Sequence, residues 1–216
     1  LGLPRMDCRV GQRPVPVIRV GASALALFAQ DDPFVGSDAR TGVHHIAVGA
    51  ADPQEMAGAA NLQGATGSGL NDTQHLVLDP ADTGGVRVRI TEPLGLDVGA
   101  SAAIERIDHL GVASSDNKSA KSVFMGQLGF AYESEQRDSE VEVVGESFTS
   151  DVYPIGFYNR PPHLVGSIGV TFLTVGDCEL EFLQDLTATV TADEGRHNQA
   201  GNTRGDRSAI ARYVSR

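Results

Sequence analysis

The feature that most constrains the fold of this chain is an internal repeat. The segment at 15–30 aligns without gaps on the segment at 170–185, and Gly21 falls on Gly176 in that alignment. Both segments read as a strand, a tight turn at the glycine and a second strand, which is the pattern of a β-hairpin. Repetition of this kind indicates a supersecondary unit that buries its apolar face by packing against another copy of itself.

A second alignment extends the repeat toward the N-terminal side of the unit. The segment at 42–53 matches the segment at 106–117, which places His45 on His109. The fullest copy reads as a strand at 107–113, a helix at 119–128, a strand starting at 130 and then the hairpin. The chain is therefore predicted to hold pieces of three copies: 1–30, 42–93 and 105–185.

The repeat predicts an α+β protein of βαβββ units that pair into open half-barrels. Copy one lacks its first strand and helix, so the tandem array is expected to be incomplete at both ends. We expect a degenerate unit pair at 1–93, a linker at 94–104, and a complete unit with a C-terminal tail at 105–216. Within that tail, 205–214 has the pattern of a short capped helix.

The charge balance argues against several classes of partner. The formal net charge is −11, and a surface this acidic repels phosphate backbones and anionic lipids. The sequence predicts no nucleic-acid binding and no membrane association. Cys8 and Cys178 match no zinc or redox spacing, and no signal-peptide pattern begins the sequence, so a cytoplasmic location is expected.

Three motifs carry a resemblance to a known superfamily. They are the segments IDHLGV at 107–112, QLGF at 127–130 and VGDCELEFL at 175–183. With the repeated unit, they resemble the vicinal oxygen chelate superfamily, which includes glyoxalase I, methylmalonyl-CoA epimerase, extradiol dioxygenases and bleomycin-resistance proteins. Among these the pattern is most similar to methylmalonyl-CoA epimerase, on the segments DPADTGGV at 79–86 and GDRSAIARYVSR at 205–216.

The resemblance implies a divalent metal ion, which could be cobalt, nickel, zinc, manganese or iron. By residue match His109 and Glu181 are its ligands in copy three, and His45 is a third candidate in copy two. Arg89 stands where copy two should have a carboxylate, and Ala26 replaces the ligand in copy one. Copies one and two are therefore expected to form a pair without a metal site.

A general base is harder to assign. Epimerisation next to a carbonyl needs one, and the resemblance places it at Ser167 in copy three and at Gln12 in copy one, neither of which is a base at neutral pH. Glu142 and Glu146, in the acidic segment at 138–148, are the alternative candidates. They equally fit a solvated acidic hairpin.

Two further features suggest substrate contacts. Arg89 could bind an anionic group of a substrate, or it could be a plain salt-bridge residue. Copy three also carries an insertion at 136–165 that could form a pocket wall or could simply pack onto the barrel. The candidate side chains in this insertion are Tyr153, Phe157, Tyr158 and His163.

Three functions remain open on the sequence. The first is a metal-dependent isomerase or lyase acting on a small oxygen-rich substrate such as an acyl-CoA. The second is an extradiol-type iron(II) dioxygenase, for which two histidines and one carboxylate would be a suitable set. The third is a metal-free small-molecule binding protein of the bleomycin-resistance type. The partner expected in every case is a small molecule, and a homodimer could supply the strands that the chain lacks.

Overall fold

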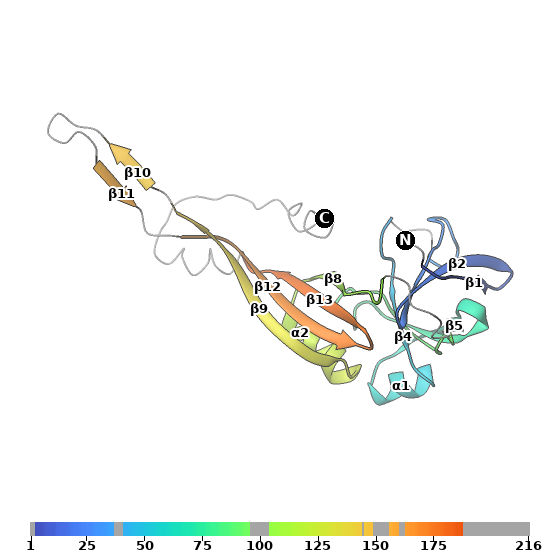
Figure 1. Cartoon of the computed structure of the whole chain (residues 1–216). Helices are drawn as coiled ribbons and strands as arrows, with labels where there is room; N and C mark the ends of the chain where they lie inside the picture. Colours follow the sequence, from blue (N-terminus) through green and yellow to red (C-terminus); the bar gives the residue numbers. More distant parts are fainter. Residues whose placement is uncertain are drawn as a thin grey trace.

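The computed structural model describes residues 3–36, 41–95, 104–143, 145–148, 156–159 and 163–187. Within these ranges it contains two complete βαβββ units and one three-stranded sheet (Figure 1). This confirms the predicted α+β class and the three copies. The predicted tail helix at 205–214 and most of the 94–104 linker lie outside the described residues. None of the helices in the described ranges is long and apolar enough to cross a membrane.

Copy three is a four-stranded sheet covered on one face by a helix. Its strands lie in the order β8-β13-β12-β9, with β8 parallel to β13 and the other neighbours antiparallel. The bounds are β8 His109–Ser114, α2 Asn117–Lys121, η2 Ser122–Gln127, β9 Ala131–Glu142, β12 His163–Val175 and β13 Cys178–Asp185. The predicted helix at 119–128 is thus an α-helical turn that continues as a π-helix.

Copy two repeats the same topology on a smaller scale. Its strands lie in the order β4-β7-β6-β5, again with the first and last strands of the unit parallel. The bounds are β4 Ile46–Gly49, α1 Pro53–Ala59, β5 Gly64–Ser68, η1 Leu70–Asp72, β6 Gln74–Leu78 and β7 Val88–Thr91. Asp52 caps α1 by accepting hydrogen bonds from the backbone N–H groups of Gln54 and Glu55.

Copy one is the antiparallel sheet β1-β2-β3, formed by Arg5–Val10, Arg13–Val20 and Ser23–Ala26. It corresponds to the last three strands of a unit, as the sequence alignment predicts. Gly21 and Gly176 occupy equivalent hairpin turns, with φ of 62° and 61°. The matching left-handed backbone confirms the alignment, because glycine adopts this conformation without the steric cost that other residues incur.

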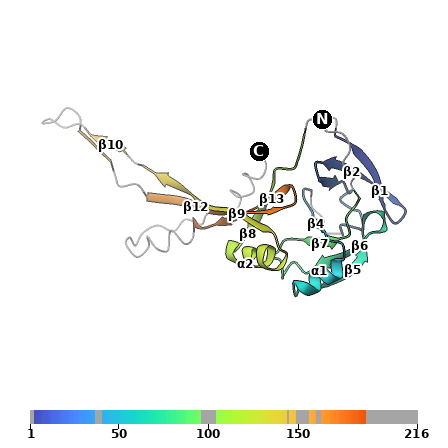
Figure 2. The ribbon, with the colours of Figure 1, turned by 60° about the horizontal axis from the view of Figure 1, so that its bottom comes forward.

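One hydrophobic core joins copies two and three. It combines side chains of both sheets and of both unit helices, among them Val88 and Ile90 of β7, Phe124 of η2 and Phe182 of β13. A second, smaller cluster forms between copy one and η1, around Cys8 and Val17. Figure 2 shows α1 and α2 on the same side of the molecule.

The insertion of copy three forms an arm. Strands β9 and β12 pair over their full lengths and run beyond the body of the protein, and the hairpin β10 Gly145–Phe148 and β11 Gly156–Asn159 continues them (Figure 1). The described strands of the insertion therefore project away from the two units (Figure 1). Whether the predicted aromatic side chains form a pocket wall or pack on the barrel lies outside the described residues.

The two equivalent hairpin turns meet each other. The Asp177 carboxylate accepts hydrogen bonds from the Ala22 backbone N–H at 2.7 Å and from the Ser23 hydroxyl at 2.9 Å. Copy one is thereby fixed to copy three as well as to copy two.

We expect Asp177→Ala to lower the free energy of unfolding by about 1–2 kcal/mol, because two hydrogen bonds to a charged acceptor are lost. Urea denaturation measures this change. Asp7→Ala is the matched control, since its carboxylate is 83% exposed and forms a surface ion pair with Arg5; it should change stability by less than about 0.5 kcal/mol. Equal effects of the two substitutions would contradict the structural role of the turn contact.

Candidate functional site

Two of the predicted ligands meet on the face of copy three that lies opposite its helix. Glu181 of β13 is in register with Gly111 of β8, two residues after His109. His109 Nε2 lies 3.6 Å from Glu181 Oε2, and the two side chains are 47% and 20% exposed. The parallel β8–β13 pair therefore places an imidazole nitrogen and a carboxylate oxygen next to each other at an accessible face.

The neighbouring carboxylate of Asp108 orients the imidazole ring. Asp108 Oδ2 lies 3.2 Å from His109 Nδ1, and Arg106 Nη2 donates to the other oxygen of the same carboxylate. These two contacts hold the pKa of Asp108 below its usual value. If Nδ1 carries the proton that Asp108 accepts, the lone pair of Nε2 in a neutral ring faces the Glu181 carboxylate.

The geometry of this pair is compatible with a bound cation. At 3.6 Å, the Nε2 lone pair of a neutral imidazole and the carboxylate could share one bound cation. Two ligand atoms about 2.1 Å from one tetrahedral ion lie about 3.4 Å apart, which is close to the observed separation. Imidazole nitrogen and carboxylate oxygen suit zinc, iron and related divalent ions.

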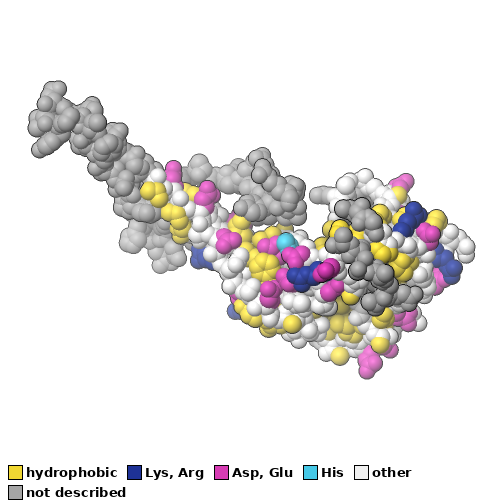
Figure 3. Space-filling view, in the orientation of Figure 1, with side chains coloured by type: hydrophobic (Ala, Val, Ile, Leu, Met, Phe, Trp, Pro, Cys, Tyr) yellow, Lys and Arg dark blue, Asp and Glu magenta, His cyan; other side chains and the backbone are white. Residues whose placement is uncertain are grey.

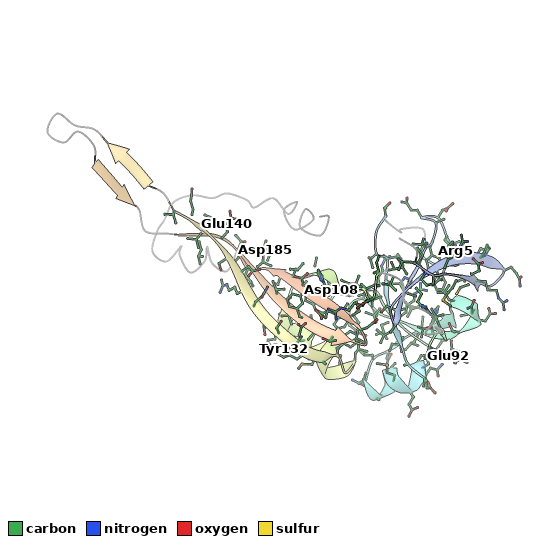
Figure 4. The ribbon with its side chains drawn as sticks, viewed as in Figure 1. Arg5, Glu92, Asp108, Tyr132, Glu140 and Asp185 are labelled. Atoms are coloured by element: carbon green, nitrogen blue, oxygen red, sulfur yellow. The ribbon has the colours of Figure 1, made fainter. Side chains whose placement is uncertain are left out.

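The surroundings of the pair are acidic. Glu179 lies on the same face of β13, and its carboxylate is 3.9 Å from Arg106. Burial, together with the nearby charge of Glu179, raises the pKa of Glu133. Figure 3 shows a histidine among acidic side chains in the region of β8 and β13, and Figure 4 shows Asp108 there. The local charge thus favours a cation.

A complete metal site is not formed by these residues alone. In the described part of the chain, no group of three or more histidine, cysteine, aspartate or glutamate side chains could hold an ion. His109 and Glu181 fit a metal as two of its ligands and leave the remaining positions for other donors. The equivalent face of copy two is covered by copy one and the segment after it, whereas no other described unit covers this face of copy three.

Copy two has the same register with different chemistry. Arg89 of β7 is in register with Ala47 of β4, two residues after His45, as Glu181 is with respect to His109. The sequence alignment of these positions is therefore confirmed. Arg89 is only 9% exposed, and its guanidinium lies 3.9 Å from the ring centre of Phe34 and donates to the Phe34 carbonyl oxygen at 2.8 Å.

No carboxylate contacts the Arg89 guanidinium among the described residues. Its Nη1 atom is buried without a hydrogen-bond partner. Burial lowers the pKa of Arg89, and burial with the charge of Arg89 lowers the pKa of His75, which is 8% exposed. This interior is a region of positive potential that disfavours a metal ion, as expected for a degenerate copy.

His45 belongs to this positive region and is not beside His109. Its ring packs against Phe34 and Phe28, at centroid separations of 6.1 and 6.5 Å. Burial and then the charge of Arg89 lower the pKa of His45 to about 3. The structure therefore groups His45 with Arg89 and places His109 with Glu181 in a separate cluster.

A short hydrogen-bonded chain links His45 to the edge of β7. Arg87 Nη1 lies 2.6 Å from His44 Nε2, and His44 Nδ1 lies 2.9 Å from His45 Nδ1. Because arginine only donates, His44 Nε2 must accept, so the proton of a neutral His44 lies on Nδ1 and is donated to His45. His45 then carries its own proton on Nε2. Strand alternation predicts an exposed His44, but both histidines precede β4, and His44 is half-buried.

The hydrogen-bonded side chains of Arg87, His44 and His45 border a cleft between copies two and three. The cleft has a volume of about 490 Å³. His44, His45 and Arg87 line it on one side, and Gly111, Val112 and Ala113 of β8 line it on the other.

The candidate bases lie far from the His109–Glu181 pair. Glu142 is in register with His163 and Glu181 with Phe172, which are nine positions apart on β12. At about 3.3 Å per residue this is about 30 Å. Figure 4 shows Glu140, two residues before Glu142, out on the arm. Glu142 therefore cannot act as a base at His109 within the same chain.

For the other predicted residues of the insertion, either the structure describes only the backbone or they lie outside the described residues. Glu146 and Tyr158 face each other across β10 and β11, with Phe157 adjacent, and their side chains and that of His163 are outside the described part of the structure. Tyr153 also lies outside the described residues. Ser167, at the position where the resemblance places the base, is buried and accepts a hydrogen bond from Arg137 at 2.8 Å.

Sequence reasoning missed two contributors to these clusters. Asp108 immediately precedes the predicted ligand His109, and this adjacency could have identified it as an orienting carboxylate. His75 is a residue of β6 and pairs with Thr91 of β7. Thr91 is two positions after Arg89 on the same strand. Nothing in the repeat singles out His75, because its counterpart in the sheet of copy three is not a histidine.

Comparison with known proteins gives a weak structural likeness. No protein-family model and no curated protein sequence matches the chain. A solved structure of a triple mutant of 4-hydroxymandelate synthase from Streptomyces coelicolor aligns with 83% of this chain, at 15% identity and a TM-score of 0.44. This chain covers 52% of that protein, or about half of its length.

Proposed function

We propose that the chain is a protein of the vicinal oxygen chelate type that binds a divalent metal ion through His109 and Glu181. The carrying observation is the 3.6 Å approach of His109 Nε2 to Glu181 Oε2 on an open sheet face. The βαβββ topology of two units, with parallel first and last strands, supports the superfamily. When bound, the ion would hold a small substrate through two neighbouring oxygens and stabilise negative charge on them.

The residues of this chain have distinct parts in that proposal. Asp108 holds the His109 ring so that Nε2 faces Glu181, and the acidic surroundings attract the cation. The remaining ligands would come from a second copy of the chain packed on the same open face, as copy one packs on copy two. A homodimer is therefore part of the proposal.

The positions of the candidate general bases favour a dioxygenase over an epimerase. An epimerase needs a base at the reacting carbon, but Ser167 is buried in hydrogen bonds and Glu142 is out on the arm. An oxygenase does not require such a base, so the dioxygenase alternative is the better supported of the two enzyme readings. A metal-free binding protein is the second candidate, favoured by the cation-repelling interior around Arg89.

Metal analysis of the chain tests the proposal. Protein purified without chelators should contain iron or another divalent metal, and Glu181→Gln should weaken metal affinity at least about tenfold, because a neutral amide is a poor ligand. Glu135→Gln, on the exposed face of β9, is the control and should retain metal. Wild-type protein that binds none of iron, zinc, cobalt, nickel or manganese would support the binding-protein alternative.

A further inference from the structure

The interior between copies one and two holds a guanidinium that still has a donor to offer. Arg89 is only 9% exposed, and its Nη1 atom is buried without a hydrogen-bond partner. Arginines are rarely buried without a carboxylate, because desolvation of the charge is expensive. An acceptor that reached Nη1 would therefore recover a hydrogen bond that the free protein lacks, and an anionic acceptor would also offset the buried charge.

Phe34 fills the space next to this guanidinium. Its ring centre lies 3.9 Å from Arg89 Cζ, and its carbonyl oxygen accepts a hydrogen bond from Nη2 at 2.8 Å. The Phe34 ring stacks on that of Phe28, with centroids 5.0 Å apart, and meets the rings of His45 and His75 at steep angles. A single residue thus supplies Arg89 with both a planar apolar group and one oxygen acceptor.

Phe34 comes from a strap that belongs to no strand. The strap, residues 31–36, lies between β3 and β4, and Phe34 is half-buried in it. Asp32 anchors the strap, because its carboxylate pairs with Arg13 of β2 and accepts from the Phe34 backbone N–H at 2.8 Å. Displacement of the strap would therefore break the Asp32 and Arg89 contacts but no pairing between strands.

We propose that the interior between copies one and two binds a small aromatic carboxylate, and that Phe34 occupies this site in the free protein as an internal substitute. Two carbons separate the ring of Phe34 from its carbonyl, which defines a ligand with a ring, a two-carbon spacer and a carboxylate. Its ring would lie over Arg89 and one oxygen would accept from Nη2, as in Phe34. Its second oxygen would be available to Nη1, which the single carbonyl oxygen leaves unpaired.

The charge of the surroundings favours a carboxylate over a neutral ligand. Burial lowers the pKa of His45, and the charges of Arg89, His44, His75 and Arg87 lower it further. Burial and then the charge of Arg89 also lower the pKa of His75. All four of these neighbouring groups are basic, so a negative charge placed among them is stabilised.

Hydrocinnamate, which has this ring, spacer and carboxylate, is the probe, measured by isothermal titration calorimetry on metal-free protein. Hydrocinnamyl alcohol lacks the charge, and cyclohexanepropionate lacks the planar ring. We expect saturable binding of hydrocinnamate, with the alcohol at least about tenfold weaker and cyclohexanepropionate at least about threefold weaker. Equal binding of either control compound, or no binding of hydrocinnamate by the wild type, would overturn the proposal.

Variants of the strap test whether Phe34 competes with the ligand. Phe34→Ala removes the internal substitute, so it should bind hydrocinnamate at least about tenfold more tightly than the wild type. Asp32→Ala releases the strap and leaves the lining of the site intact, so it should raise the affinity at least about threefold. Asp31→Ala, at the exposed neighbouring position, is the matched control and should not. Unchanged affinity in Asp32→Ala would refute the assignment even if Phe34→Ala fails to fold.

This site and the proposed metal site can fail separately. Arg89→Met should weaken hydrocinnamate binding at least about tenfold and leave metal content unchanged, because it removes both donors of the proposed site. Glu181→Gln should do the reverse, since Glu181 belongs to β13 of copy three. Loss of hydrocinnamate binding in Glu181→Gln, or its retention in Arg89→Met, would contradict a site between copies one and two.

Discussion

Phe124→Ala is expected to lower the free energy of unfolding by about 3–5 kcal/mol, the usual cost of removing a large, fully buried aromatic side chain. Phe124 is 0% exposed in the π-helix η2. Its ring lies 4.9 Å from that of Phe182 and 5.5 Å from that of Phe130, between centroids. The substitution leaves a cavity in the core shared by copies two and three, so both units should lose stability together.

Chemical denaturation followed by circular dichroism measures this effect. The adjacent Met125 is 40% exposed, so Met125→Ala is a matched control in the same helix and should cost less than about 1 kcal/mol. A loss below about 1.5 kcal/mol for Phe124→Ala would contradict the shared core. Two separate unfolding transitions in the wild type would contradict the packing of copies two and three as one body.

Much of the fold follows from the repeat in the sequence. A glycine turn at equivalent places in two hairpins, and a histidine at matching positions of two aligned segments, were enough to predict three copies of one unit. The same alignment predicted that Arg89 and Glu181 occupy equivalent positions, and the registers agree. Register is predictable here because one face of each sheet is buried, which fixes the alternation of every strand.

The surroundings of those positions were not predictable in the same way. The repeat predicts which residues share a face of a sheet, but it does not predict which segment covers that face. Arg89 is buried because copy one and Phe34 lie over it, whereas Glu181 remains accessible on the equivalent face of copy three. The His44–His45–Arg87 chain also escaped prediction, since it forms before the strand begins and strand periodicity does not apply there.

Acidification should destabilise the protein through His45. Its pKa in the folded state is lowered to about 3 by burial and by Arg89, whereas the unfolded chain has the usual value of about 6.5. His44, His75 and Arg87 act in the same direction on this pKa. Between these two values the unfolded state binds a proton that the folded state does not, so the free energy of unfolding falls as the pH falls.

From pH 7 to pH 5 the expected loss from His45 alone is about 2 kcal/mol, since the folded-state pKa lies below this window and the unfolded-state pKa lies within it. The pKa of His75 is also lowered, by burial and by Arg89, and adds to the same slope. His45→Gln should therefore reduce the pH dependence between pH 5 and 7 but not abolish it. Urea denaturation at a series of pH values gives the slope directly.

The exposed His109 provides a comparison within the same chain. Its ring contacts the carboxylates of Asp108 and Glu181, and it is not among the groups that lower the pKa of His45, so His109→Gln should leave the loss of stability on acidification in place. Arg89→Met should raise the pKa of His45 and make the slope shallower, because it removes the positive charge that lowers this pKa most while keeping an apolar side chain of similar length. If His45→Gln and wild type show the same slope, His45 is not buried among positive charges between copies one and two.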